Sequence, residues 1–241
     1  MPVVTRTGMA MTTSRTITET AHLLRLLAWL SPAFPTGGFA YSHGIEWAAA
    51  AGDIRDAATL LEWVDDVLRH GAGRSDAILL RHAHRAAAAG DLDALMEVAE
   101  LAMAAQPARE RQAESAGQGN AFVLAAASWR PDLLRALAAR IDHIAYPVAV
   151  GTLAGAHGIC ADMTVAATLQ AFAANLISAA IRLVPLGQSA GLSVLAALEA
   201  AATDVAAATA DATLDDLGGA CFRSNLAALC HETQYTRLFR S

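Results

Sequence analysis

At 241 residues the chain can bury the core of one domain, and its hydrophobic fraction of 55% comes mostly from alanine and leucine, which favour helices. All 17 basic residues are arginine, and the net charge of −6 argues against a nucleic-acid partner. Without lysine the chain has neither a Schiff-base nucleophile nor the phosphate-binding lysine of a P-loop.

The three cysteines bear on the cellular compartment. Cys160, Cys221 and Cys230 are an odd number without CxxC spacing, so they predict neither a disulfide framework nor a zinc knuckle. We expect a reducing environment and a cytoplasmic location. Residues 1–20 are rich in threonine, lack the apolar region of a secretory signal and are predicted to form a disordered tail.

The first helix is expected to follow this tail. Thr16 and Glu19 have the spacing of a capping box. After them, four leucines fall on one helical face: Leu23, Leu26, Leu27 and Leu30. Ser31-Pro32 should end this helix, and a loop should follow before helix resumes over residues 39–51.

The rest of the chain predicts further helices joined by short turns. Gly71 and Gly73 should end the helix over residues 60–68, Ser75 or Asp76 should cap the next one, and Gly90 should close it. Later helices are expected from the N-cap Asp91 to Pro107, and over residues 109–127, 131–142, 146–159, 163–184, 189–210 and 213–229. The fold class is therefore all-α, a single-domain bundle of about ten helices over residues 21–230.

One stretch raises the question of a membrane span. Residues 163–181 are 19 positions without a charge, long enough to cross a bilayer. Much of the stretch is alanine, and Thr168, Gln170 and Asn175 interrupt it, so insertion would be weak. We predict a buried central helix and no membrane partner.

Signatures of common enzymes are missing from the sequence, which has no P-loop, no Gly-x-Ser-x-Gly elbow and no His-Glu-x-x-His. We therefore predict no catalytic residue. For a metal, the weak candidates are His157 and Cys160, whose spacing puts both on one face of a helix. Two ligands do not close a metal site, and the adjacent pair Cys230-His231 is weaker still.

Two segments carry unusual composition. Ser31–Glu46 combines two prolines and a glycine pair with three aromatic residues, which suits either a rigid corner between helices or an interface. The terminal segment His231–Ser241 contains tyrosine, phenylalanine, leucine and two arginines, residue types of interfaces. It is either a strap packed on its own bundle or a tail that binds a partner.

These segments resemble the urease accessory protein F (UreF) family. The resemblance rests on the proline-glycine-aromatic segment that ends in Ser-His-Gly-x-Glu, and on the closing Arg-Leu-Phe-Arg-Ser. It extends from about Leu23 to the last residue and includes the stretches 119–122, 146–148 and 185–188. Ile45 and Thr236 are mild departures, standing where leucine and serine are expected.

The resemblance implies an all-helical homodimer that is not an enzyme and acts through contacts. Its implied partners are a UreD-type (UreH-type) accessory protein, the nickel-carrying GTPase UreG and apo-urease. It implies no tightly bound cofactor, with nickel only in transit. Partner-binding roles carry over to two groups of residues: Phe34, Pro35, Gly37, Gly38, Tyr41, Ser42, His43 and Glu46 in the first segment, and His231, Glu232, Tyr235, Arg237, Leu238, Phe239, Arg240 and Ser241 in the second.

Within the family, the role is described as scaffold, GTPase modulator or nickel conduit, and the sequence does not choose between them. Two other classes stay open. One is a metallochaperone that binds nickel through His157, Cys160 or the Cys230-His231 pair. The other is a helical enzyme whose pocket would gather His43, Glu46 and a distant arginine.

Overall fold

The computed structural model describes residues 7–241, with side chains from Ile17 onward. In this part of the chain all regular structure is helical. The α-helices are α1 (Thr7–Trp29), α2 (Ile45–Ala50), α3 (Ala57–His70), α4 (Ala72–Ala89), α5 (Leu92–Ala104), α6 (Arg109–Ala125), α7 (Asp132–Ala138), α8 (Tyr146–Ala156), α9 (Ala161–Ile181), α10 (Gln188–Ala197), α11 (Glu199–Ala208) and α12 (Phe222–His231). Three short 3-10 helices, η1 (Gly38–Ala40), η2 (Ala126–Trp129) and η3 (Leu214–Asp216), join them. The predicted all-α class is confirmed.

The most extensive contact between two helices of the core is that of α4 with α8. A Cβ on Gly151 would lie 2.4 Å from the carbonyl oxygen of Leu80, and one on Gly155 would lie 2.3 Å from that of His84. Only glycine permits such an approach, because any larger side chain would enter the α4 backbone. Helix α8 is therefore buried on nearly every side, and α6 and α7 pack against its other faces.

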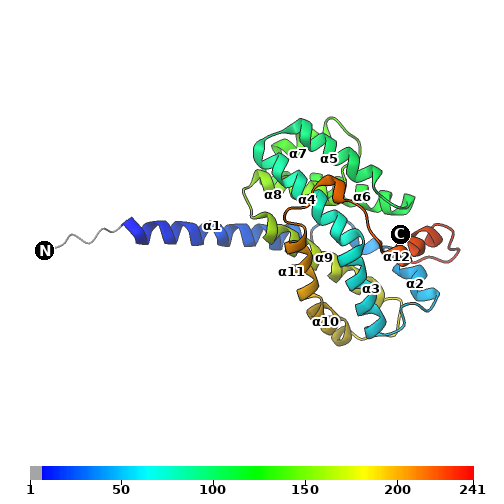
Figure 1. Ribbon diagram of the computed structural model, residues 1–241. Coiled ribbons are helices and arrows are strands. Elements are labelled where there is room, and N and C mark those ends of the chain that lie inside the picture. The colour runs from blue at the N-terminus through cyan, green and yellow to red at the C-terminus, as the bar shows by residue number, and fades with distance from the viewer. Residues whose placement is uncertain (1–6) are drawn as a thin grey trace.

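Helix α9 runs through the middle of the molecule (Figure 1) and packs against α2, α3, α4, α8, α10 and α11. Its length and composition would suffice to cross a membrane, as would those of Gln188–Ala208, the span that covers α10 and α11. Here Val165, Leu169, Ala173 and Leu176 lie in the protein core instead. The uncharged stretch is a core helix of this fold, as predicted.

Helix α1 differs from expectation in its length and its burial. It begins at Thr7, so helix replaces the predicted disordered tail over residues 7–20, and residues 1–6 lie outside the described part. No proline lies between residues 7 and 29, so every backbone N–H there can take part in a continuous helix. The helix projects from the body (Figure 1), so of the four leucines only Leu26 is buried, while Leu23 and Leu27 are exposed.

Three predicted helices are interrupted. The helix expected over residues 39–51 is reduced to η1 and α2, because His43 and Gly44 adopt positive φ angles of 60° and 79°. The expected helix 189–210 divides at Leu198 into α10 and α11. The expected helix 213–229 divides into η3 and α12, and Gly218 with φ of 120° turns the chain between them.

Several predicted helix ends are confirmed. Gly90 closes α4 in the left-handed conformation, and the Asp91 carboxylate caps α5 by accepting from the N–H of Ala94 at 3.0 Å. Helix α4 begins at Ala72, ahead of the expected caps Ser75 and Asp76. Gly73 lies inside α4, where the helix passes the end of α3. A larger residue would not fit there, because its Cβ would lie 2.6 Å from the Cα of Leu68.

Candidate partner-binding site

The two unusual segments of the sequence pack directly on each other, and the C-terminus lies beside α2 and α12 (Figure 1). The N–H of Ser42 donates to the main-chain oxygen of Ser241 at 3.0 Å, and the Ser42 hydroxyl donates to the same oxygen. The N–H of Arg240 donates to the carbonyl of Ala40 at 2.9 Å. The final residues therefore form a strap along the Ser31–Glu46 segment.

The carboxylate of Glu46 holds this strap. Its two oxygens accept from the N–H groups of Leu238 at 2.6 Å and Phe239 at 2.8 Å. Glu46 is buried, so these charge-assisted hydrogen bonds replace the water that the carboxylate loses on folding. Helix α2 positions it, and Gly44 lets α2 approach α12, since a Cβ there would lie 2.8 Å from the backbone nitrogen of Ala228.

A fully buried histidine links the strap to α6. His231 lies between two carboxylates, with Nε2 at 3.2 Å from Glu46 and Nδ1 at 2.5 Å from Glu110. Glu110 also accepts from Arg237 at 2.5 Å. The imidazole thus lies between a carboxylate of α2 and a carboxylate of α6, with one ring nitrogen facing each. The Glu232 carboxylate accepts from the first N–H of α6, where a negative charge is favourable.

A second buried cluster holds the last residue. The Ser241 hydroxyl donates to Glu114 at 2.6 Å, and Arg111 forms an ion pair with the same carboxylate. Burial opposes the ionisation of Glu114, but Arg111 and His43 outweigh it and lower its pKa to about 2. Burial together with Arg111 lowers the pKa of His43 to about 4, so this imidazole is neutral at pH 7. Its Nδ1 lies 3.8 Å from Glu114, too far for a hydrogen bond.

Comparison with known proteins identifies the family. A family model described as UreF matches residues 54–199. A urease accessory protein UreF of Bradyrhizobium sp. strain BTAi1 is 52% identical over 95% of this chain and 96% of its own length. The chain belongs to the UreF family. Proteins of the same name from Bradyrhizobium diazoefficiens and Methylorubrum populi are 53% and 51% identical, over 92% and 90% of this chain and 93% and 98% of their own lengths. This UreF-family chain is therefore a urease accessory protein with a role in urease maturation.

Six of the sixteen predicted partner-binding residues of this UreF chain are buried, and a seventh, Phe34, packs against the core. Ser42, His43, Glu46, His231 and Ser241 are buried and make the contacts described above, as does Phe239 beneath the Arg182 guanidinium, 4.3 Å from its ring centroid. Phe34 packs on Phe122 and Trp129, with ring centroids 5.2 and 5.9 Å away. For these residues the structure agrees with a rigid corner in the Ser31–Glu46 segment and a strap at His231–Ser241.

The other predicted residues face outward or line a turn. Tyr235 and Leu238 have exposed fractions of 102% and 58%, which is unusual for large apolar side chains. The remaining exposed or half-buried ones are Pro35, Gly37, Gly38, Tyr41, Glu232, Arg237 and Arg240. In this UreF chain, the buried residues of the two segments thus hold the exposed ones in place.

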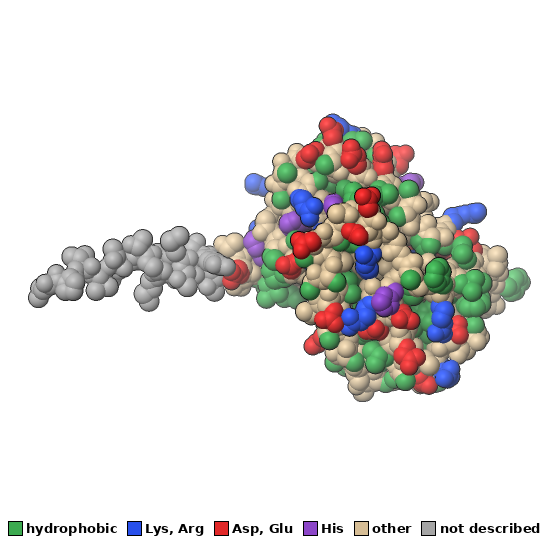
Figure 2. All heavy atoms as spheres, viewed as in Figure 1, with side chains coloured by type: hydrophobic (Ala, Val, Ile, Leu, Met, Phe, Trp, Pro, Cys, Tyr) green, Lys and Arg blue, Asp and Glu red, His purple; other side chains and the backbone are tan. Residues whose placement is uncertain are grey.

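Sequence reasoning missed the residues of other helices that complete the site. Glu110, Arg111 and Glu114 on α6 hold the strap, and their three-to-four residue spacing within an otherwise apolar chain was the available signal. It also missed the outer face of α12, where Phe222, Leu226 and Leu229 are exposed. Hydrophobic side chains gather at this end of UreF, over α2 and α12 (Figure 2).

The suggested metal ligands do not converge. Helix α8 ends at Ala156, and Gly158 with φ of 65° turns the chain. The prediction that His157 and Cys160 share a helical face is therefore wrong. Both ring nitrogens of His157 are engaged, by Arg25 at 3.2 Å and by the carbonyl of Trp129 at 2.7 Å. Within the described residues no group of three or more His, Cys, Asp or Glu could hold a metal ion.

Proposed function

We propose that this chain is a non-catalytic adaptor of urease maturation. It joins a UreD-type (UreH-type) accessory protein and a UreG-type GTPase on apo-urease, and it couples GTP-dependent nickel delivery to urease activation. The main support for the proposal is that the two family motifs pack on each other. The buried Glu46 of the first motif binds the strap and thereby holds the exposed side chains of Tyr235 and Leu238 in place.

The proposed partner surface comprises Phe222, Leu226 and Leu229 on the outer face of α12, together with the exposed strap residues Tyr235 and Leu238. These apolar side chains are exposed close to the arginines Arg237 and Arg240, and aromatic, apolar and arginine residues are the common anchors of protein interfaces. We propose that this surface binds the UreD-type accessory protein. The UreG-type GTPase and apo-urease then join through this complex.

The ionisable groups of the site support an adaptor rather than a catalyst. Glu46, Glu110 and Glu114 are each bound to strap groups or to a basic side chain. Glu114 stays ionised and His43 stays neutral near pH 7, because their pKa values lie near 2 and 4. A general acid or base works best with a pKa near the operating pH, so both are poorly suited to proton transfer.

The proposal includes a homodimer formed through α1. Ile17, Leu24 and Leu27 form an exposed apolar stripe along this helix, with exposed fractions of 65%, 62% and 61%. Such a stripe is costly in water, and a second copy that brings the same stripe would cover it symmetrically.

The test is co-purification with the UreD-type and UreG-type proteins of the same operon. The variant should change only exposed atoms, so we choose Tyr235→Ala combined with Leu238→Ala. The matched control is Leu192→Ala, an equally exposed leucine on α10. Truncation after Thr236 is a poorer choice, because it also removes the buried Phe239 and Ser241 and leaves Glu46 and Glu114 without their strap partners.

We expect the wild-type chain and Leu192→Ala to form the ternary complex and the double variant to lose it, with unchanged helicity by circular dichroism. Loss of both side chains at an interface centre costs about 2–4 kcal/mol, or roughly 30-fold or more in affinity. A wild-type chain that retained neither protein would overturn the proposal. A double variant that bound as well as the wild type would move the partner surface elsewhere.

A further inference from the structure

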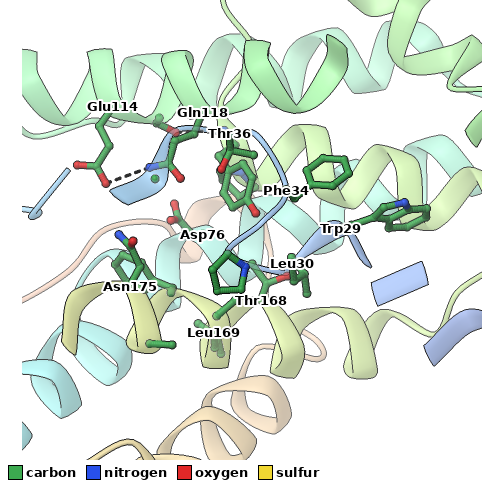
Figure 3. Close-up of a pocket in the computed structure, with 18 of the residues that line it drawn as sticks. Trp29, Leu30, Phe34, Thr36, Asp76, Glu114, Gln118, Thr168, Leu169 and Asn175 are labelled. Atoms are coloured by element: carbon green, nitrogen blue, oxygen red, sulfur yellow. Dashed lines mark hydrogen bonds between the residues drawn. The ribbon is translucent and has the colours of Figure 1, made fainter. Parts of the chain in front are cut away.

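A pocket of about 250 Å³ lies between α1, the Ser31–Phe39 segment, α4, α6, α8 and α9. Figure 3 shows its two ends, with Trp29, Leu30 and Phe34 on one side and Asp76, Glu114, Gln118 and Asn175 on the other. The exposed residues Pro32 and Phe39 also line it, so the pocket reaches the surface there. It is large enough for a small organic molecule.

The polar end has spare hydrogen-bond acceptors. Asp76 makes no hydrogen bond or ion pair with any described residue, and its half-buried side chain lines the pocket. The Gln118 amide nitrogen donates to Glu114 at 3.4 Å, which turns the amide oxygen the other way. This oxygen, Asn175 Oδ1 and Thr36 Oγ1 lie 3.3 to 3.7 Å from the point where a Cβ of Gly38 would be. Glycine at this position leaves the space in front of the three oxygens free.

The charges of this end also favour a cation. Arg111 and Glu114 on α6 neutralise each other as a buried ion pair, and His43 is uncharged at pH 7. Burial raises the pKa of Asp76 to about 7, against the opposing effect of Arg111. The carboxyl is therefore partly ionised at neutral pH, and an ionised Asp76 has no counter-charge of its own among the described residues.

We infer that this pocket binds a cationic hydrogen-bond donor group on an apolar stem, an alkylguanidinium or alkylammonium. The charged head would donate to Asp76, Gln118 and Asn175, and the stem would lie along Phe34 and Leu30. The acceptor oxygens of Asp76, Gln118 and Asn175 favour a donor-rich head, and the apolar end favours the stem. The inference concerns a site separate from the proposed partner surface and does not rest on the proposed function.

The test is calorimetric titration of the full chain with butylguanidinium. A ligand of this size should bind with a dissociation constant of roughly 10 mM or tighter. The neutral isostere N-butylurea has the same shape without the charge and should bind about 10-fold more weakly or not at all. Binding should strengthen from about pH 6 to about pH 8 as Asp76 ionises, with proton release when the ligand binds at the lower pH.

Two variants locate the site. Asp76→Asn and Asn175→Leu, both close to the natural side chain in size, should each weaken butylguanidinium binding about 10-fold or more. The matched control is Asp66→Asn, which removes an exposed carboxylate on α3 and should leave binding unchanged. Circular dichroism confirms that each variant is folded. No binding by the wild-type chain, or equal binding by wild type and Asp76→Asn, would overturn the inference.

A second arm separates a free compound from a basic side chain of a partner. A blocked Gly-Arg-Gly peptide presents the same guanidinium on a main chain. If the peptide binds more tightly than butylguanidinium, the natural ligand is an arginine side chain of another protein. If butylguanidinium binds more tightly, it is a free small cation.

Discussion

At the scale of single residues, Asp76 and His43 give the chain opposite responses to pH. The pKa of Asp76 is raised from 3.8 to about 7, so between these values the folded chain binds more protons than the unfolded chain, and this carboxyl lowers stability as pH rises. The pKa of His43 is lowered from 6.5 to about 4, so its contribution to stability is lost as pH falls through that range. The two effects oppose each other over the same window.

Asp76→Asn should separate them. The variant keeps His43 and removes the cost of ionising the carboxyl, so its stability relative to the wild type should increase between about pH 4 and pH 8 by about 1–3 kcal/mol. Urea unfolding at both pH values measures this difference. A difference that stayed constant with pH would show that Asp76 titrates normally in the folded chain.

Glu46 is the residue on which the strap depends most. Its carboxylate accepts the N–H groups of Leu238 and Phe239 and faces His231, so Glu46→Ala leaves both strap N–H groups without their acceptor. We expect a loss of about 2–4 kcal/mol in the free energy of unfolding and faster tryptic cleavage after Arg237 and Arg240. Glu62→Ala, which removes an exposed carboxylate of α3, is the control and should change neither. A strap that stayed resistant to trypsin in the variant would mean that the contacts of Ser241 suffice.

At the scale of helices, stability depends on how closely α4 and α8 approach. Gly151→Ala places a methyl group 2.4 Å from the carbonyl oxygen of Leu80, so the two helices must move apart. We expect a loss of about 2–4 kcal/mol by urea unfolding. Gly187→Ala is the matched control, because nothing lies within 4 Å of its Cβ and its φ of −76° suits alanine. Equal stability of the two variants would contradict this account of the α4–α8 contact.

At the scale of the whole molecule, the projecting α1 helix predicts association. Leu24→Gln combined with Leu27→Gln makes the exposed stripe polar without touching the buried Leu26. If α1 forms the dimer, the wild type should have twice the monomer mass by light scattering, and the variant should be a monomer at micromolar concentration. Leu192→Gln on α10 serves as control and should stay dimeric. A dimeric double variant would place the dimer contact on another face.

Much of the fold follows from local sequence. Alanine and leucine content, the cap at Asp91, the turn at Gly90 and the long apolar α9 are local signals, and the structure agrees with each. Two helix starts were predicted wrongly, because the backbone turns at these places although the surrounding residues favour helix. His43 and Gly44 shortened α2, and the turn at Gly218 delayed α12, although alanine and leucine favour helix on either side.

The sequence by itself determined the helical class, most helix boundaries and the two motifs that place the chain among UreF proteins, because these depend on residues close together in the chain. Only the tertiary structure decided that the two motifs pack on each other, that α6 supplies two further carboxylates that bind the strap, and that Asp76 lines a pocket. Those contacts join residues more than a hundred positions apart, such as the 127 positions between Glu114 and Ser241. Burial then sets their charge states, which depend on neighbours that only the packing of helices brings together.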